Sequence, residues 1–212
     1  MSVLDKLATS LNRNDESPNQ ELAKQIVDQN DKKAVKELII NLNNPNKNIQ
    51  GDCIKVLYEI GEQKPNLIAS YADEFIALLD KKNNRLVWGA MTALDALTIE
   101  NPTAICSSLP KIVEIVNKGS VITKDHGVNI LTKLSSLKQY SDTAFPLLIE
   151  QLKSCPTNQL PMYAEKAAKT IKDKNKATVL TKTLASRLDD IEKDTKRKRV
   201  EKVIKQLSIL SY

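Results

Sequence analysis

Side chains that commonly do chemistry in proteins are scarce in this chain. It has one histidine, His126, and three cysteines, Cys53, Cys106 and Cys155. No Cys-x-x-Cys pair occurs, and His126 has no cluster of cysteine, histidine or carboxylate residues at metal-ligand spacing. A glycine-rich phosphate loop, a His-Glu-x-x-His motif and a nucleophile elbow are also missing. We therefore predict reduced and mostly buried thiols, no Ser-His-Asp arrangement, no catalytic residue, no metal and no cofactor, as expected of a protein that is not an enzyme.

The remaining chemistry is that of recognition, by the single tryptophan Trp88 and by lysines. Residues 150–212 hold 15 Lys and Arg against 8 Asp and Glu, whereas residues 1–149 hold 17 against 18. A basic end of this kind suits an acidic or nucleic-acid partner. It is also the ordinary composition of a solvated helix face, and the sequence leaves both interpretations open.

The elements that position these residues repeat with a period of 37. A period between about 20 and 50 residues is typical of solenoid folds, in which stacked units share one core. Hydrophobic residues make up 41% of the chain, which is enough to bury such a core. Four registers recur four times each: Cys53, Ala90, Gly127 and Ala164; Val56, Ala93, Ile130 and Ala167; Leu57, Leu94, Leu131 and Ala168; Ile60, Leu97, Leu134 and Ile171.

Taken in order, the chain reads as helical hairpins. Apolar spacing predicts a helix over 2–12, and Ser17 with Pro18 reads as the capped start of a second helix. These two helices form an expected N-terminal cap, residues 1–30. From Asp31, itself an expected N-cap, each unit of about 37 residues places a first helix, a short turn and a second helix, over 31–209. We expect residues 1–212 to form one repeat domain.

The end of the array departs slightly from the period. A first helix is predicted over 177–191, and its partner matches the earlier second helices at a shift of 36 instead of 37. The apolar positions of that last helix are Val200, Val203, Ile204 and Leu207.

These patterns resemble the HEAT-repeat family over about 31–209. Residues 108–113 and 144–149 look like its first-helix proline motif, and Asp80 with 85–90 looks like its aspartate turn and arginine-bearing second helix. The Asp and Arg pair is clear in this repeat only. The resemblance implies an all-α, armadillo-like helical fold: a right-handed α-solenoid, or α-α superhelix, of about five hairpins. In that family the second helices line a concave side that binds partners.

Helical rotation predicts which residues line that side. At 100° per residue, positions 53, 56, 57 and 60 share one face, so 55, 58 and 62 point away from the core. Trp88 falls on the outward face, where it is either a binding hot spot or a packing residue against a neighbouring helix, and Met162 is better explained by packing. The expected partner-binding residues are Lys55, Tyr58, Trp88, Thr92, Asp95, Asn129, Met162, Lys166, Lys169, Lys198, Lys202 and Lys205.

Two functions fit this surface. The first is a non-catalytic protein–protein interaction module or scaffold that binds a protein, or an extended acidic peptide, along the concave groove. The alternative is a nucleic-acid-binding protein that uses the basic C-terminal half, similar to the HEAT-like DNA glycosylases that act on alkylated purines. No segment approaches the length of apolar residues that a membrane span needs, and the N-terminus has no secretory-signal pattern. We therefore expect a cytoplasmic protein without a membrane partner.

Overall fold

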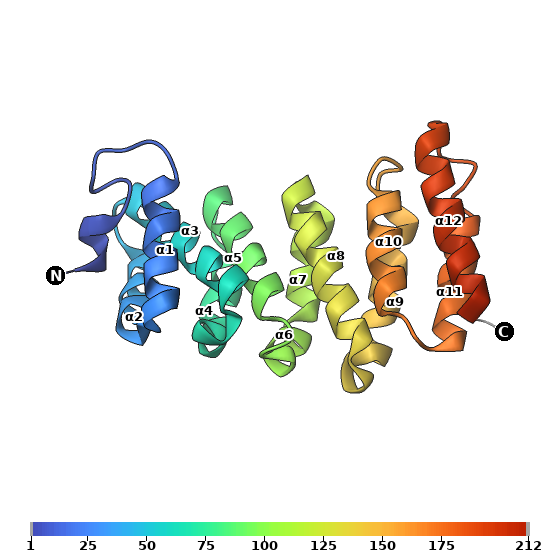
Figure 1. The fold of residues 1–212 in the computed structure, drawn as a ribbon, viewed down its shortest axis with the longest axis horizontal. Coiled ribbons are helices and arrows are strands. Elements are labelled where there is room, and N and C mark those ends of the chain that lie inside the picture. The colour runs from blue at the N-terminus through green and yellow to red at the C-terminus, as the bar shows by residue number, and fades with distance from the viewer. Residues whose placement is uncertain (1, 211–212) are drawn as a thin grey trace. The chain divides into compact units, whose positions relative to one another are not determined.

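The computed structural model describes residues 2–210, and the regular structure among them is entirely helical (Figure 1). The chain divides after His126 into two compact units, residues 1–126 and 127–212. Helix α8 (Val121–Ser136) supplies its first residues to the first unit and the others to the second. No helix in the described part of the chain has the length and apolar composition to cross a membrane.

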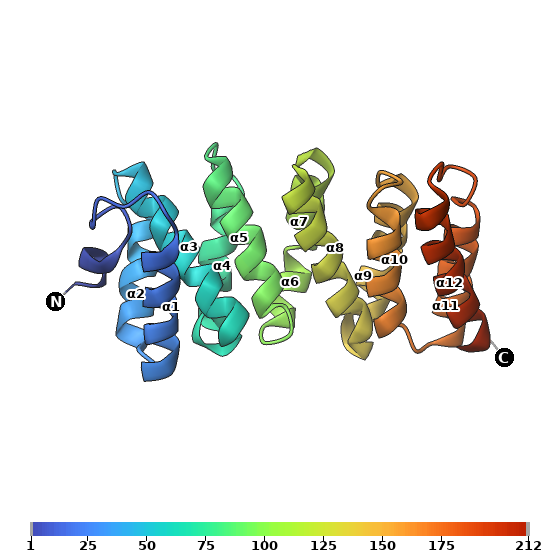
Figure 2. The same ribbon diagram turned by 45° about the horizontal axis from the view of Figure 1, so that its top comes forward.

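The first unit is a series of helix pairs. Within it α3 (Lys47–Gln63) packs against both α1 (Ser17–Gln29) and α5 (Asn84–Leu97), and α4 (Ala72–Leu78) packs on α5 (Figure 2). Single turns of 3-10 helix, η1 (Val3–Lys6), η2 (Asn41–Asn43), η3 (Pro65–Leu67) and η4 (Ala69–Tyr71), connect the longer elements. Those elements are α1 (Ser17–Gln29), α2 (Lys32–Ile40), α3 (Lys47–Gln63), α4 (Ala72–Leu78), α5 (Asn84–Leu97), α6 (Pro102–Ser107) and α7 (Leu109–Lys118).

Short polar side chains begin several of these helices, because they satisfy backbone N–H groups that lack a helical partner. Asp31 accepts the N–H groups of Lys33 and Ala34, each at 3.0 Å, which confirms its predicted role as the N-cap of α2. The prediction for Ser17 is wrong. Ser17 is the first residue of α1, and its own N–H is accepted by the Asp15 carboxylate at 3.0 Å.

The segment before α1 also differs from the prediction. Among the described residues before Asn12, the only regular structure is the single turn η1, although apolar spacing favoured a longer helix over 2–12. Asn12 has a positive φ of 54°, a conformation that stops a right-handed helix. Leu7 and Ala8 are nevertheless buried, so the segment still covers the core.

The second unit consists of the later part of α8, α9 (Lys138–Ser154), α10 (Leu160–Thr170), α11 (Lys174–Ala185) and α12 (Asp194–Leu210). Helix α12 packs against α10 and α11, and α9 packs against the same two helices. The helix predicted over 177–191 starts and ends earlier than expected. Arg187, which follows its end, donates to the carbonyl oxygens of Leu152 and Lys153 at 2.8 and 2.6 Å, and so caps the end of α9.

The predicted packing repeat is confirmed. All sixteen residues of the four registers are buried, from Cys53 in α3 to Ile171 after α10. In α12 three of the four predicted positions are buried, and Ile204 is half-buried. The period of 37 is therefore a period of core contacts: each hairpin supplies one layer of the apolar interior, and neither of its helices buries an apolar face without the other.

Candidate interaction surface

Lys55 occupies an outward position of α3, yet its side chain is only 8% exposed. Its Nζ lies 2.8 Å from Glu16 Oε2 and 2.7 Å from Glu59 Oε1, and 4.8 Å from the centre of the Tyr58 ring. The prediction that Lys55 stands at the surface available to a partner is therefore wrong. Its physical reason is that the segment before α1 brings Glu16 over this face of α3 and encloses the ammonium group.

The titration behaviour of this cluster follows from its burial and charges. Burial alone would lower the pKa of Lys55, but the bonds to Glu16 and Glu59 outweigh it and raise that pKa above its ordinary value. Burial raises the pKa of the Tyr58 hydroxyl, against the opposing effect of Lys55. Burial, followed by the charge of Glu59, likewise raises the pKa of the Glu62 carboxyl. On this face of α3, the charge of Lys55 is thus compensated by Glu16 and Glu59.

Asp95, in α5, is also less accessible than predicted, with 7% of its surface exposed. Its Oδ2 lies 2.8 Å from Nδ1 of His126, and Nε2 of the same ring lies 3.0 Å from Oγ1 of Thr92. Sequence reasoning gave His126 no such neighbours, because its partners are 31 and 34 residues away. These bonds connect α5 to the first turns of α8.

A hydroxyl, an imidazole and a carboxylate in this order are also the components of a Ser-His-Asp catalytic triad, in which the hydroxyl gives its proton to the imidazole. Thr92 Oγ1 also lies 3.0 Å from the backbone oxygen of Trp88, one turn earlier in its own helix. A threonine hydroxyl that donates to its helix is the usual mid-helix arrangement for this residue. With that proton committed to the helix, the geometry is that of a polar link between helices.

Trp88 and Tyr58 are each half-buried, on α5 and α3. Rotation along the helix correctly kept both side chains out of the fully buried core. Each leaves part of an aromatic ring at the surface of the first unit. This intermediate exposure is compatible with both interpretations of Trp88 that the sequence left open.

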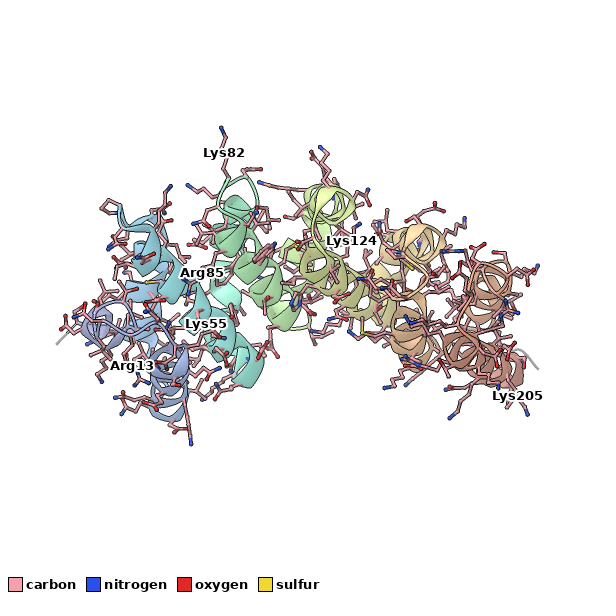
Figure 3. All side chains as sticks on the ribbon, turned by 90° about the horizontal axis from the view of Figure 1, so that it is seen from above. Arg13, Lys55, Lys82, Arg85, Lys124 and Lys205 are labelled. Carbon is pink, nitrogen blue, oxygen red and sulfur yellow. The ribbon has the colours of Figure 1, made fainter. Side chains whose placement is uncertain are left out.

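In the second unit the predicted lysines are much more accessible. Lys169, Lys198, Lys202 and Lys205 are all exposed, on α10 and α12, which pack together. Figure 3 shows Lys205 at the outer side of α12. Lys198 forms an ion pair with Asp194, its neighbour one turn earlier, at 3.1 Å.

The other predicted residues of this unit are half-buried. Lys166 donates to Asn129 Oδ1 at 2.8 Å, a bond that joins α10 to α8, and Met162 lies in the same face of α10. Lys166 and Met162 therefore lie at the edge of the unit's interior, with part of each residue at the surface.

Arg199 is a residue of this surface that the sequence reasoning missed. Its Nε and Nη2 donate to the two carboxylate oxygens of Glu165 at 2.8 and 2.7 Å, a two-point ion pair between α12 and α10. These bonds lower the pKa of the Glu165 carboxyl, and the charges of Lys169 and Lys202 act in the same direction. Several cations therefore surround one carboxylate.

Several polar contacts between successive hairpins join residues about one period apart, from 31 to 37 residues along the chain. Arg85 lies 3.2 Å from Asp52, which is 33 residues earlier, and Arg199 lies 34 residues after Glu165. Asp80, the residue of the aspartate turn, is bound by Lys111 and not by Arg85. A search for opposite charges about one period apart would have found these pairs, because such residues occupy equivalent places in neighbouring hairpins.

The helix pairs and their periodic core define a class, the all-α solenoid of HEAT- and armadillo-like repeats. No known family profile matches the chain, and no curated protein matches its sequence. Solved structures do match. An engineered protein is 16% identical over 100% of this chain and 99% of its own, with a TM-score of 0.62.

Two further structures name the repeat type. The archaeal HEAT-like repeats protein from Thermococcus onnurineus is 13% identical, covering 93% of this chain and 98% of its own, with a TM-score of 0.51. A designed armadillo repeat protein in complex with the peptide (KR)4 is 12% identical, covering 91% of this chain and 87% of its own, with a TM-score of 0.68. At these identities the likeness establishes the fold.

Proposed function

We propose that this protein is a non-catalytic interaction module that binds an extended acidic segment of a partner protein along its second helices. The observation that carries the proposal is the lysine face of the second unit, formed by Lys169, Lys198, Lys202 and Lys205. These side chains are exposed on two helices that pack together, and within residues 2–210 Lys198 alone among them forms an ion pair.

The charge of the second unit supports an acidic partner. Residues 127–212 contain 17 Lys and Arg against 9 Asp and Glu. Opposite charge steers association and selects among partners, so a segment rich in glutamate and aspartate fits this face.

The likeness to designed armadillo repeat proteins supports the mode of binding. One of those structures was made for modular peptide recognition, and another contains the peptide (KR)4. That peptide is basic, so the comparison supports recognition of a peptide by a repeat surface, and the sign of the partner's charge rests on the lysines of this chain.

Binding of a fluorescein-labelled peptide of alternating glutamate and glycine to the full chain tests the proposal by anisotropy. The double variant Lys169→Glu, Lys202→Glu is expected to bind about ten-fold more weakly. Lys24→Glu with Lys36→Glu is the matched control, since both lysines are exposed and lie in the first unit. Equal loss in both variants would reduce the effect to net charge and contradict a specific face.

Duplex DNA provides the second comparison. Phosphate-backbone binding weakens steeply as salt rises from low to physiological concentration. If DNA binds the wild-type chain more tightly than the peptide and the lysine variant abolishes that binding, the partner is a nucleic acid and the proposal fails in its choice of partner.

A further inference from the structure

A cavity of about 520 Å³ opens between the beginnings of α3 and α5 in the first unit. Four of the residues that line it are cationic: Lys47 at the start of α3, Lys81 and Lys82 in the turn before α5, and Arg85 in the first turn of α5. Asn48 and Asn84, both exposed, lie among them. No aspartate or glutamate lines this cavity in the described structure.

This concentration of positive charge is unusual for the unit that contains it. Residues 1–126 hold 15 Lys and Arg against 17 Asp and Glu. The ion pairs near the cavity join Arg85 to Asp52 and Lys111 to Asp80, and within the described part of the chain neither Lys47 nor Lys82 forms one. Figure 3 shows Lys82 extending from its turn away from the helices. The two lysines are therefore available to a ligand.

The carboxylates nearest in the sequence, Asp80 and Asp52, already have hydrogen-bond partners. Asp80 is paired with Lys111. Asp52 accepts the backbone N–H of Thr9 at 2.8 Å as well as one nitrogen of Arg85, and it lines a neighbouring cavity instead of this one. Arg85 is therefore paired with Asp52, whereas Lys47 and Lys82 have no carboxylate partner within the described part of the chain.

Arg85 is held in place between α3 and α5, as Figure 3 shows. A Cβ atom at Gly51 would lie 2.7 to 2.8 Å from three atoms of the Arg85 guanidinium group, so the group rests directly on the backbone of α3. Asp52 fixes one edge of the group at 3.2 Å. With 48% of its side chain exposed, Arg85 keeps part of its surface free to meet a ligand.

We propose that this cavity binds a phosphate monoester, carried by a phosphorylated serine or threonine of a partner segment. Four cations around one concavity favour a dianion over a single carboxylate, and arginine and lysine together are the usual ligands of phosphate oxygens. The cavity is larger than a phosphate group, which leaves room for the residue that carries it. Only the identity of the carrier rests on the proposed function.

The test is a ¹H–¹⁵N NMR titration of the full chain with inorganic phosphate, then with a phosphoserine peptide and its unphosphorylated counterpart. We expect saturable shifts confined to residues 46–50 and 81–86, and tighter binding of the phosphopeptide than of either other ligand. Lys47→Gln with Lys82→Gln should weaken phosphopeptide binding about ten-fold. Lys24→Gln with Lys36→Gln is the control and should leave it unchanged.

The outcomes separate this site from the lysine face of the second unit. Shifts that spread over all exposed lysines, or equal weakening by both double variants, would overturn the phosphate site. Binding of inorganic phosphate without preference for the phosphopeptide would overturn the assigned carrier. Neither result bears on the glutamate peptide, whose binding depends on Lys169 and Lys202.

Discussion

The two units use their polar side chains differently, although both are built on the same repeat. In the first unit, charged outward groups of α3 and α5 have partners within the fold: Lys55 binds Glu16 and Glu59, and Asp95 binds His126. In the second unit most of the lysines at corresponding positions of α10 and α12 are exposed. A repeated backbone therefore fixes where a side chain points, while the neighbouring hairpin decides whether its charge remains available.

The largest expected effect comes from removing a buried cation, Lys55. Lys55→Ala should lower the free energy of unfolding by about 2–3 kcal/mol, because it leaves the carboxylates of Glu16 and Glu59 together without a cation. Lys202→Ala, the exposed counterpart, should change it by less than about 0.5 kcal/mol. Urea unfolding followed by circular dichroism measures both.

Thiol labelling tests whether this loss of stability is confined to the first unit. Cys53 is buried in the first unit and Cys155 in the second, and burial raises the pKa of Cys53 to about 12, so the folded chain reacts slowly there. In a Cys106→Ser background, Lys55→Ala should accelerate labelling of Cys53 more than that of Cys155. Equal acceleration would show that the units do not open separately.

A smaller loss is expected where two helices approach closely. A Cβ atom at Gly89 would lie 2.5 Å from Cγ1 of Ile54, so Gly89→Ala should destabilise the α3–α5 contact by about 1–2 kcal/mol despite the better helix propensity of alanine. Tyr163 holds the same repeat position in the second unit, two periods later, where the side chain is buried. Thermal unfolding measures the change, and a more stable variant would mean that Ile54 moves aside without cost.

Trp88 tests whether the first unit also contributes to binding. Because the side chain is half-buried, Trp88→Ala should cost about 1 kcal/mol of stability, well below the value for a core tryptophan, and should weaken partner binding. Trp88→Phe, which retains most of the packing, is the control for folding. A stability loss of about 3 kcal/mol or more would identify Trp88 as a core residue and remove it from the binding surface.

The smallest expected effects concern the pH dependence of stability, which should have opposite signs for Glu62 in the first unit and Glu165 in the second. The pKa of Glu62 is raised in the folded state, so the native chain binds this proton more tightly, and its contribution to stability is fully present below the unfolded pKa and is lost as pH rises through the folded pKa. The pKa of Glu165 is lowered, so its contribution is present above the unfolded pKa and is lost as pH falls through the folded one. At neutral pH Glu62→Gln should stabilise and Glu165→Gln destabilise, each by about 0.5 kcal/mol.

Urea midpoints from about pH 3 to 7 check these signs, since the unfolded carboxyl titrates near the middle of that range. Each variant should approach the wild-type stability at the acidic end, where the replaced carboxyl is protonated and uncharged. The same sign for both substitutions at neutral pH would contradict the assigned directions.

Much of the fold could be predicted from local and periodic features. The buried registers of Val56 and Leu57 and the cap at Asp31 were read correctly, because apolar spacing and helix capping depend on residues close in sequence. The helix expected before Asn12 and the cap expected at Ser17 were wrong. The positive φ of Asn12 ends any helix before it, and the Asp15 carboxylate accepts the N–H of Ser17. Apolar spacing reveals neither feature.

The candidate site was less predictable. Helical rotation places Lys55 and Lys202 alike, and the structure buries one and exposes the other. It also gathers Lys47, Lys82 and Arg85 around one cavity, although no motif connects them. Rotation gives the direction of a side chain relative to its own helix and contains no information about which segment covers it.

By itself, the sequence determined that this protein is a stack of helical hairpins, since burial of an apolar stripe every 37 residues leaves few other ways to form a core. Only the tertiary structure decided which charges compensate one another and which face a partner. The physical reason is range: helix formation and apolar periodicity are set by neighbours along the chain, whereas an ion pair between hairpins needs two side chains that are about one period apart in the sequence to come within about 4 Å.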